Sequence, residues 1–263
     1  MIDLNGFMST LDFQHEKTHQ HGRAYQDCLE RSDEHFHPDG RPMLAPFSLV
    51  TGHLIDLAEP DFAHLTLEEF LTAAAGGLAR TNRYGGQTDP AYGVARHCLL
   101  GLELVDETIA AHPDVLEWFS RELLDPAEAR ERLRDHVGLH FLLHDVSEGL
   151  GLCDVPYPLK RLIAPLYDPL EELMMAAVYR RLGLERPAPE VVALVKRIDY
   201  QMLCEEMWHL RGRENYRERA HHNWSDRSVW FGGESNGEYG VIGTAQTWTE
   251  QVRNHLTAVK GNT

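Results

Sequence analysis

Long stretches of helical periodicity fill the chain between residues 66 and 212 and restrict it to a helical fold. Within them, apolar residues recur every three or four positions, which is the spacing of one buried helix face. The stretches cover residues 66–80, 91–111, 126–150, 157–184 and 188–212, and a shorter one covers 247–259. The pattern predicts an all-α fold, a helical bundle.

Local signals mark where some of these helices begin or stop. Thr66 with Glu69 three residues later has the form of a capping box, so we expect a helix to start after Thr66. Because proline removes a backbone donor, we expect the 157–184 stretch to be interrupted at Pro165 or Pro169. The weak alternation in 47–57 predicts a short hairpin.

Composition changes along the chain suggest three parts. Residues 1–46 are polar and predict an N-terminal extension, while the periodic stretches predict one helical domain over 47–212. From 213 the chain turns polar and glycine-rich before its last amphipathic piece, so we expect 213–263 to be a C-terminal extension.

The bulk composition limits what the protein can bind. A hydrophobic fraction of 43% is enough for a sizeable core in a globular protein. The net charge of -16 argues against binding duplex nucleic acid or an anionic membrane, because both partners need a basic surface. An anionic substrate is still allowed, since a metal ion or an arginine can reverse the field in one pocket.

The targeting and cysteine signals favour the cytoplasm. The first residues lack the basic and apolar regions of a signal peptide, and no apolar run reaches the length of a membrane span. Cys28, Cys98, Cys153 and Cys204 are far apart and form no CxxC motif. We expect free thiols in a reducing, cytoplasmic compartment.

Four polar residues interrupt otherwise apolar helix faces. His97 lies within "YGVARHCLL", His144 and Asp145 follow "VGLHFLL", and Asp199 lies within "VVALVKRIDYQML". One such residue alone is usually a hydrogen-bonded core residue. Two imidazoles and two carboxylates from facing helices can instead hold a divalent transition metal and leave positions open for water and substrate.

The order His, then His-Asp, then Asp resembles the HD superfamily of metal-dependent phosphohydrolases. The stretches that carry the resemblance are "YGVARHCLL", "LLHDVSEGLGLCDVPYPLK" and "KRIDYQMLCEE". The resemblance implies an HD-domain helical bundle in which His97, His144, Asp145 and Asp199 bind the metal. It implies one divalent transition metal, and it leaves Co, Mn, Zn and Fe open, with Mg as a further candidate.

Further motifs are similar to the 5'-deoxynucleotidase-like branch of that superfamily. This branch has an Arg before the first His, then His-Asp-x-x-Glu, then an acid before Pro-x-Pro-x-Lys; Arg83, Glu148 and Asp154 stand at these positions. The resemblance covers about residues 47–210. It implies that Glu148 is the acid or base of the reaction and that Asp154 contacts the substrate sugar or a metal-bound water. A surface salt bridge for Glu148 and a turn or helix cap for Asp154 are the plain alternatives.

Three residues are expected to contact the substrate. Arg83 has the planar fork that suits a phosphate clamp, although Arg80 exchanges roles with it if the alignment shifts. Tyr84 is expected to line the pocket. Lys160 is expected to add positive charge for a phosphate chain, with an exposed helix lysine as the alternative.

These motifs together predict an enzyme: a phosphohydrolase acting on nucleotides, foremost a 5'-nucleotidase on (deoxy)nucleoside monophosphates. One alternative is a triphosphohydrolase, which needs more positive charge around the pocket. A second alternative is a di-iron oxygenase, which needs extra histidines between Asp145 and Asp199, where this chain has none. The expected partners are a small nucleotide and a second copy in a homodimer.

Overall fold

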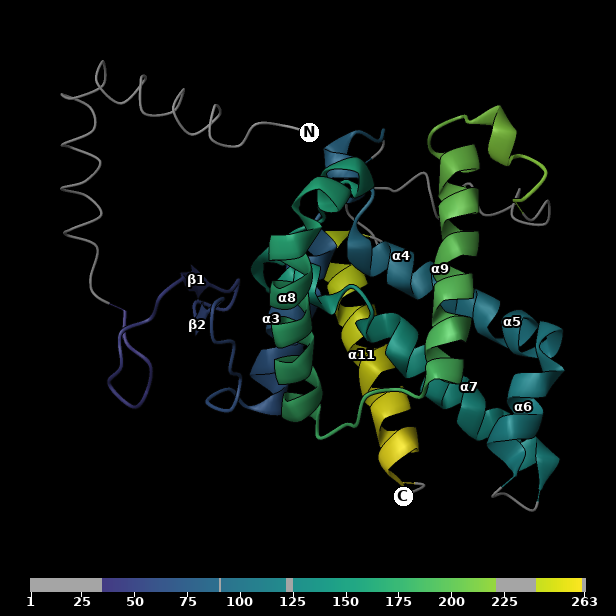
Figure 1. The fold of residues 1–263 in the computed structure, drawn as a ribbon, viewed down its shortest axis with the longest axis horizontal. Coiled ribbons are helices and arrows are strands. Elements are labelled where there is room, and N and C mark those ends of the chain that lie inside the picture. The colour runs from purple at the N-terminus through teal and green to yellow at the C-terminus, as the bar shows by residue number, and fades with distance from the viewer. Residues whose placement is uncertain (1–34, 90, 122–124, 221–239, 262–263) are drawn as a thin grey trace. The chain divides into compact units, whose positions relative to one another are not determined.

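A computed structural model describes residues 35–89, 91–121, 125–220 and 240–261, and it confirms the all-α class (Figure 1). Strand β1 (Pro46–Ser48) pairs antiparallel with β2 (Leu54–Asp56), and Phe47 faces Ile55 in the register. This small hairpin lies where the alternation in 47–57 predicts it. Outside the hairpin and two isolated bridges, the described residues form helices, turns and loops.

The helices follow the predicted order and add one short helix. They are α3 (Leu67–Arg80), α4 (Val94–Gly101), α5 (Val105–Ala111), α6 (Pro113–Ser120), α7 (Pro126–Leu143), α8 (Tyr157–Leu182), α9 (Pro189–His209) and α11 (Val241–Gly261). The periodic stretch 91–111 is divided into α4 and α5 by the 3-10 turn η2 (Leu102–Leu104). Helix α6 has no counterpart in the sequence prediction.

Contacts divide the chain into two units, Met1–Met43 and Leu44–Thr263. In the first unit the described residues form a turn, in which Phe36 bridges to Pro42 and the His37 amide donates to the Arg41 carbonyl at 2.8 Å. Residues 1–34 of the expected N-terminal extension, together with Cys28, lie outside the described residues, and its last residues, 44–46, belong to the second unit.

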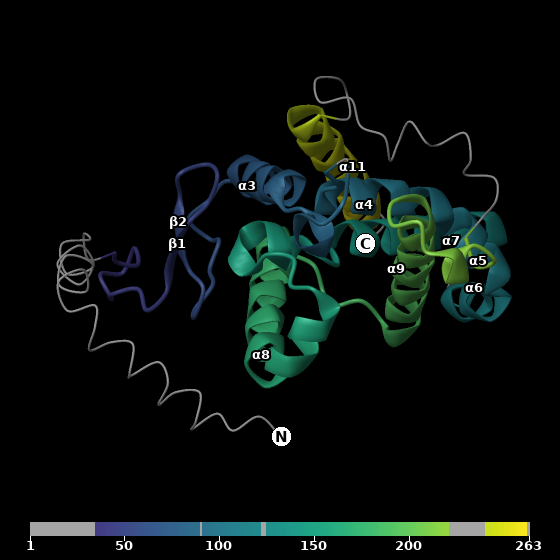
Figure 2. The same cartoon turned by 90° about the horizontal axis from the view of Figure 1, so that it is seen from above.

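The core of the second unit is built from helices that are distant in the sequence. Helix α11 packs against α3 and α7, and Figure 2 shows it beside α3 and α4. Trp248 is fully buried there, and its indole Nε1 donates to the Leu142 carbonyl at 3.2 Å. The last helix, which the sequence assigns to a C-terminal extension, is therefore part of the core.

The start of α3 follows the predicted capping box. The Thr66 hydroxyl accepts from the Glu69 amide at 3.2 Å, and the Glu69 carboxylate accepts from the Thr66 amide at 2.7 Å. Each side chain thus satisfies a backbone donor that the first helical turn leaves free. The local sequence alone fixes this boundary.

Helix α8 continues through both of its prolines, so the expected interruption at Pro165 or Pro169 is wrong. The helix bends instead. Lys160 Nζ lies 2.8 Å from Glu171 Oε1, although eleven residues of straight helix rise by about 16 Å. Proline removes a backbone hydrogen bond and clashes with the preceding turn, which is the usual cause of such a bend.

Two glycines let α3 approach the π-helical turn η3 (Glu148–Leu152) closely. A Cβ on Gly77 would lie 1.8 Å from the Gly149 carbonyl oxygen, and a Cβ on Gly149 would lie 2.7 Å from the Leu78 amide nitrogen. Both distances are too short for any side chain. Glycine at these two positions therefore sets how near Glu148 stands to the helices of the core.

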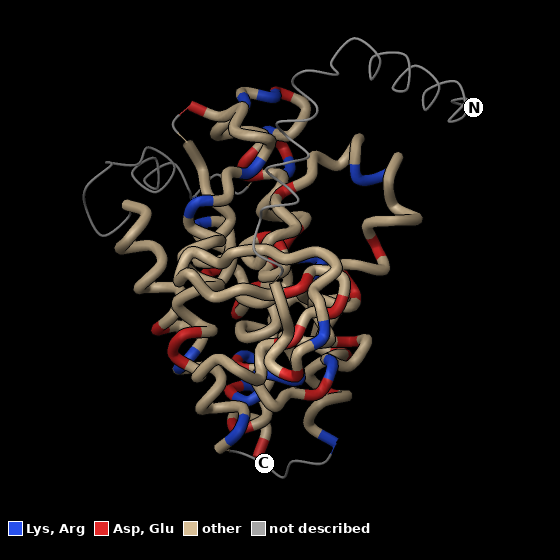
Figure 3. The backbone as a smooth tube through the Cα atoms, turned by 90° about the vertical axis from the view of Figure 1, so that its left-hand side faces the viewer, with Lys and Arg blue, Asp and Glu red and all other residues tan. Residues whose placement is uncertain are grey.

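Acidic and basic residues are interspersed along the described chain (Figure 3). Within this part of the protein, each helix is too short or too polar to cross a membrane. Cys98 and Cys204 are buried and Cys153 is exposed, all three as free thiols.

Trp248→Ala is expected to lower the free energy of unfolding by about 3–5 kcal/mol, because it leaves a large cavity under α3 and α7. Chemical denaturation of the full chain measures this loss. Trp248→Phe, which keeps an aromatic ring but not the bond to Leu142, should recover most of it. A loss below about 1 kcal/mol for Trp248→Ala would contradict a core position for α11.

Candidate metal centre

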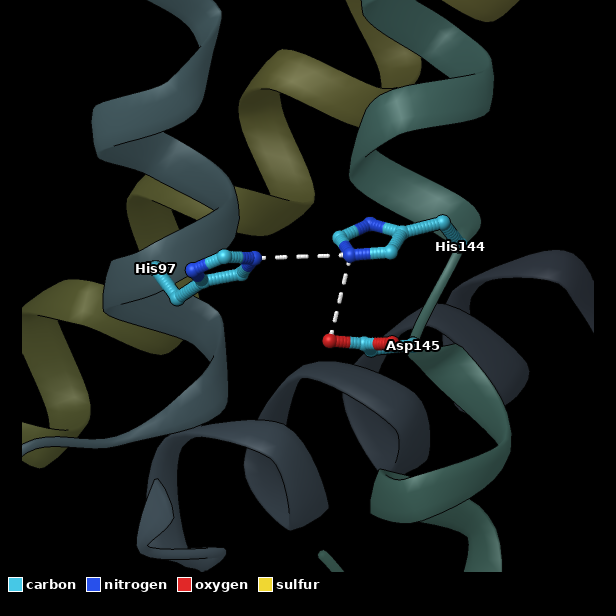
Figure 4. Close-up of side chains that lie close together, drawn as sticks. All are labelled: His97, His144 and Asp145. Atoms are coloured by element: carbon cyan, nitrogen blue, oxygen red, sulfur yellow. Dashed lines mark hydrogen bonds and ion pairs between the residues drawn. The ribbon is translucent and has the colours of Figure 1, made fainter. Parts of the chain in front are cut away.

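Three of the predicted ligands meet at the centre of the helical unit (Figure 4). His97 projects from α4, while His144 and Asp145 follow the last turn of α7. One ligand atom from each residue lies within 4.8 Å of the others. The two Nε2 atoms are 3.4 Å apart, and His144 Nε2 is 3.1 Å from Asp145 Oδ2.

Asp199 brings the fourth predicted ligand from α9. Its Oδ1 atom lies 3.3 Å from His97 Nε2 and 3.8 Å from His144 Nε2. The four residues that interrupt apolar faces in the sequence therefore converge on one point. Two nitrogen donors and two carboxylates there form a donor set that divalent transition metals accept.

Both imidazoles are held with Nε2 toward this point. His97 Nδ1 donates to Glu206 Oε1 at 2.6 Å, and His144 Nδ1 donates to the Phe141 carbonyl oxygen at 2.6 Å. A carboxylate or carbonyl oxygen only accepts, so the proton of each neutral ring stays on Nδ1. The Nε2 lone pairs are then directed at the cluster, as in most histidine metal sites.

Glu206 is the functional residue that the sequence analysis misses. Its carboxylate is fully buried and also accepts from Arg83 Nε at 3.1 Å and from the Tyr84 hydroxyl at 2.5 Å. Burial opposes its charge, but Arg83 and His97 lower the pKa of Glu206 below its usual value. Its signal in the sequence is its place two helical turns after Asp199, on the same face of α9.

The electrostatics favour a positive charge at the centre of the cluster. Burial alone would lower the pKa of His144, yet Asp145 and Asp199 raise it well above its usual value. The Asp199 side chain is only partly buried; burial opposes its charge, yet hydrogen bonds from His144 and His97 lower the pKa of Asp199. The protein therefore stabilises a proton here without metal, and a divalent cation satisfies the same field.

Arg83 connects the predicted metal ligand Asp145 to the buried carboxylate of Glu206. Its Nη1 atom donates to Asp145 Oδ2 at 3.2 Å, in addition to the bond from Nε to Glu206. The neighbouring charges of Glu206 and Asp145 raise the pKa of Arg83 although it is buried. Arg80, the alternative in the sequence, donates to the Gly76 carbonyl at 2.7 Å in α3, so the structure brings Arg83 to the cluster.

The turn that carries Arg83 is strained. Tyr84 has φ 59°, a left-handed conformation that is uncommon for a residue with a side chain, and Gly85 follows at φ 60°. The Asp154 carboxylate accepts from the backbone amides of Tyr84 and Gly85. Asp154 thus stabilises the turn η1 (Arg83–Gly86) and connects it to the loop after η3.

Glu148 is buried beside the cluster with an unsatisfied oxygen. Among the described residues, its Oε2 atom has no hydrogen-bond partner. Burial and the negative charges of Asp145 and Asp154 raise the pKa of Glu148 to about 9. Asp154 Oδ2 is similarly buried without a partner, and burial raises the pKa of Asp154. Such orphaned oxygens mark places where a ligand, water or substrate completes the bonding.

Lys160 lies outside the cluster in this structure. Its ammonium group donates to Glu171 and stands 4.7 Å above the centre of the Tyr167 ring. Both partners belong to α8, so the ammonium group of Lys160 is engaged within its own helix. Its expected contact with a phosphate chain stays a prediction.

A cavity of about 630 Å³ adjoins the cluster. His144 and Asp199 are among its lining residues, and α8 and α9 supply most of its walls. The other lining residues are His140, Asp168, Glu171, Glu172, Met175, Tyr179, Arg186, Pro187, Val192, Val195 and Lys196. This volume and this mixture of apolar and polar groups are typical of a small-molecule site.

Comparison with known proteins leaves the activity open. No family model matches the chain. The chain is similar to an uncharacterized protein of Rhodobacter capsulatus, with 35% identity over 145 residues, which is 54% of this chain and 61% of the relative. The chain thus spans about three fifths of the length of the relative that it matches.

Glu206→Gln is expected to weaken metal binding by about 10–100-fold, because the amide loses the charge that holds His97 Nδ1–H. Isothermal titration of chelator-treated protein with Co²⁺ or Zn²⁺ measures this. The matched control is Glu205→Gln, at the adjacent buried glutamate, which faces Gln201 and His209 instead. Equal metal affinity in wild type and Glu206→Gln would exclude the assigned role.

His140 makes the free energy of unfolding depend on pH. Burial lowers the pKa of His140 to about 4, so the unfolded chain takes up its proton first as the pH falls. The contribution of His140 to the free energy of unfolding is fully present above a pH of about 6.5, the pKa of histidine in the unfolded chain. It is lost as the pH falls to about 4, by on the order of 3 kcal/mol. In denaturant titrations, His140→Gln should flatten this decline, while the exposed-site control His64→Gln should keep it. An unchanged slope in His140→Gln would contradict the assignment.

Proposed function

We propose that this protein is a metal-dependent phosphohydrolase of the HD superfamily, a 5'-nucleotidase acting on (deoxy)nucleoside monophosphates. The observation that supports it most is the convergence of His97, His144, Asp145 and Asp199 beside a cavity that His144 and Asp199 line. The donor set fits one divalent transition metal, whose charge would polarise a phosphate oxygen and acidify a bound water. These four side chains would hold that ion.

Arg83 would orient the phosphate. Two of its nitrogens are bonded to Glu206 and Asp145, which fixes the guanidinium plane. The Nη2 atom of the same guanidinium carries two further N–H donors, which can donate to a phosphate oxygen. A buried guanidinium held in this way needs no rearrangement as negative charge develops on phosphorus-bound oxygens.

Glu148 would act as the general acid of the reaction. It stands one turn beyond His144, and its unpartnered Oε2 atom can carry a proton at neutral pH. As phosphorus separates from the 5' oxygen, Glu148 Oε2 can deliver this proton to the leaving alkoxide, which departs as a neutral alcohol. The carboxylate that remains can then take a proton from the next water.

The cavity offers contacts for the nucleoside part of a nucleotide. Its α8 wall carries Asp168, Glu171 and Glu172, of which Glu171 is paired with Lys160 and Glu172 with Arg186. The same carboxylates can accept hydrogen bonds from sugar hydroxyls or base amino groups. Met175 and Tyr179 supply apolar surface for a nucleoside.

The first test is phosphate release from a panel of nucleoside mono- and triphosphates. Protein stripped with chelator is refilled with Co, Mn, Mg, Zn or Fe(II). Orthophosphate from monophosphates that disappears with chelator supports the proposal. Tripolyphosphate from triphosphates favours the alternative, and silence on every nucleotide with metal bound contradicts both. The cytoplasmic location also remains a prediction, which fractionation of cells can check.

Glu148→Gln separates proton transfer from metal binding. We expect turnover to fall by about 10²–10⁴-fold while metal affinity stays near that of the wild type. Asp145→Asn should instead lose metal and turnover together, because it removes a ligand. The matched control is Glu131→Gln, on the exposed surface of α7. Full turnover in Glu148→Gln would contradict the role of Glu148 as the proton donor.

A further inference from the structure

Two hydrogen-bonded side chains line the cavity one helical turn away from the metal ligands. His140 precedes His144 by one turn on α7, and Tyr179 belongs to α8. The Nδ1 atom of His140 lies 3.2 Å from the Tyr179 hydroxyl oxygen, and the ring centres are 5.7 Å apart. Both residues line the cavity. The proposed hydrolysis uses neither polar group of this His140–Tyr179 pair.

The pair is held in place from both sides. His140 lies in the stretch Val137–Leu143 of α7, in which every residue is buried. Next to Tyr179, Arg180 Nη2 donates to the Pro60 carbonyl at 3.3 Å and Arg181 Nη2 donates to the Leu65 carbonyl at 2.7 Å. These contacts anchor the second half of α8. A hydrogen-bonding group fixed in advance loses little freedom when a ligand binds, so its contact is retained as affinity.

Both members of the pair are neutral at pH 7. Burial lowers the pKa of His140 to about 4 and raises the pKa of Tyr179 to about 12. A neutral imidazole has one donor and one acceptor nitrogen, and a phenol both donates and accepts. With one bond between them, the pair retains one donor and one acceptor for a ligand, in either order. This suits an uncharged polar edge better than it suits a phosphate.

The cavity wall near the pair offers apolar surface. Met175 lies one turn before Tyr179 on the same face of α8, and α9 contributes Val192 and Val195. A flat heteroaromatic ring needs both kinds of contact, because its faces are apolar and its edge carries donors and acceptors. Methionine is well suited to packing on such faces, since its side chain is flexible and polarisable.

The position of these groups matches the order of parts in a nucleotide. His140 lies one turn before the ligand His144 on α7, and Val195 lies one turn before the ligand Asp199 on α9. One turn of four residues rises by about 6 Å. A phosphate at the metal would therefore have its sugar beside the cluster, and the base would reach the next turn of both helices.

We propose that the His140–Tyr179 pair hydrogen-bonds the edge of the substrate's nucleobase, whose faces pack on Met175 and Val195. The inference rests on the proposed nucleotidase activity and adds the residues that recognise its substrate. It implies that the enzyme distinguishes a nucleotide from a smaller phosphate ester by the base, at a distance from the reacting phosphorus.

A comparison of two substrates tests the proposal at neutral pH with metal-loaded protein. One is a deoxynucleoside monophosphate, and the other is the methyl furanoside of 2-deoxyribose 5-phosphate, which keeps the sugar and phosphate and lacks the base. The wild type should favour the nucleotide by about 10-fold or more in kcat/KM. Tyr179→Phe, which removes only the hydroxyl, should lower kcat/KM for the nucleotide about 10-fold, mainly through KM. Its kcat/KM for the furanoside should stay unchanged.

The matched control is Tyr200→Phe, on α9. Tyr200 is 51% exposed, and its hydroxyl accepts from Arg219 Nη1 at 3.1 Å. This variant should keep the wild-type preference for the nucleotide. Circular dichroism checks that each variant is folded.

A second variant tests whether the two residues act together. His140→Gln should lose the same factor on the nucleotide as Tyr179→Phe, and the double variant should lose little more, because the two groups serve one contact. Additive losses would contradict a shared contact and overturn the proposal.

The outcomes separate this inference from the activity on which it rests. If the wild type hydrolyses neither substrate, the proposed function fails and the inference fails with it. If the wild type hydrolyses the nucleotide, the function stands and the variants decide the inference. Equal losses on both substrates in Tyr179→Phe would then indicate a contact with the sugar or a structural role, and an undiminished preference for the nucleotide would exclude any contact with the base. Either result overturns the proposal.

Discussion

The buried carboxylate of Glu206 is the contact on which the rest of the site depends. It receives hydrogen bonds from His97, Arg83 and Tyr84, which come from two segments distant from α9 in the sequence. A buried charge is tolerated only when it is paired and hydrogen-bonded, and here all three donors are also components of the site. One group therefore fixes the ring of a ligand and the plane of an arginine at the same time.

The same carboxylate offsets strain in the turn before α4. Tyr84 adopts a left-handed backbone conformation that a side chain disfavours. Its hydroxyl is bonded to Glu206, and its amide is bonded to Asp154. The two acids hold the turn from opposite ends, so that Arg83 is presented toward Asp145. Strained backbone of this kind is concentrated at functional sites, because the surrounding contacts must over-determine it.

Much of the fold could be predicted from the sequence, because its signals are local. The capping box at Thr66 and the apolar periodicities placed the main helices, and the interruptions of those periodicities selected His97, His144, Asp145 and Asp199. The sequence analysis missed Glu206 because an acidic residue near the end of a helix is usually exposed. The burial of Trp248 depends on contacts with α3 and α7, more than a hundred residues away, which periodicity cannot show. The path of α8 through its prolines is accompanied by a bond between two residues of the helix itself, Lys160 and Glu171, which the proline signal in the sequence does not reveal.

The glycine contact between α3 and η3 gives the proposed chemistry a mechanical dependence on a helix that takes no part in it. Gly77 and Gly149 touch where any carbon substituent would overlap backbone atoms. The backbones of the two elements are thus as close as two glycines allow. Glu148 adjoins Gly149, so the position of Glu148 depends on this close contact. A methyl group added at Gly77 would force η3 away from α3, and it would therefore displace Glu148 as well as destabilise the packing of the two elements.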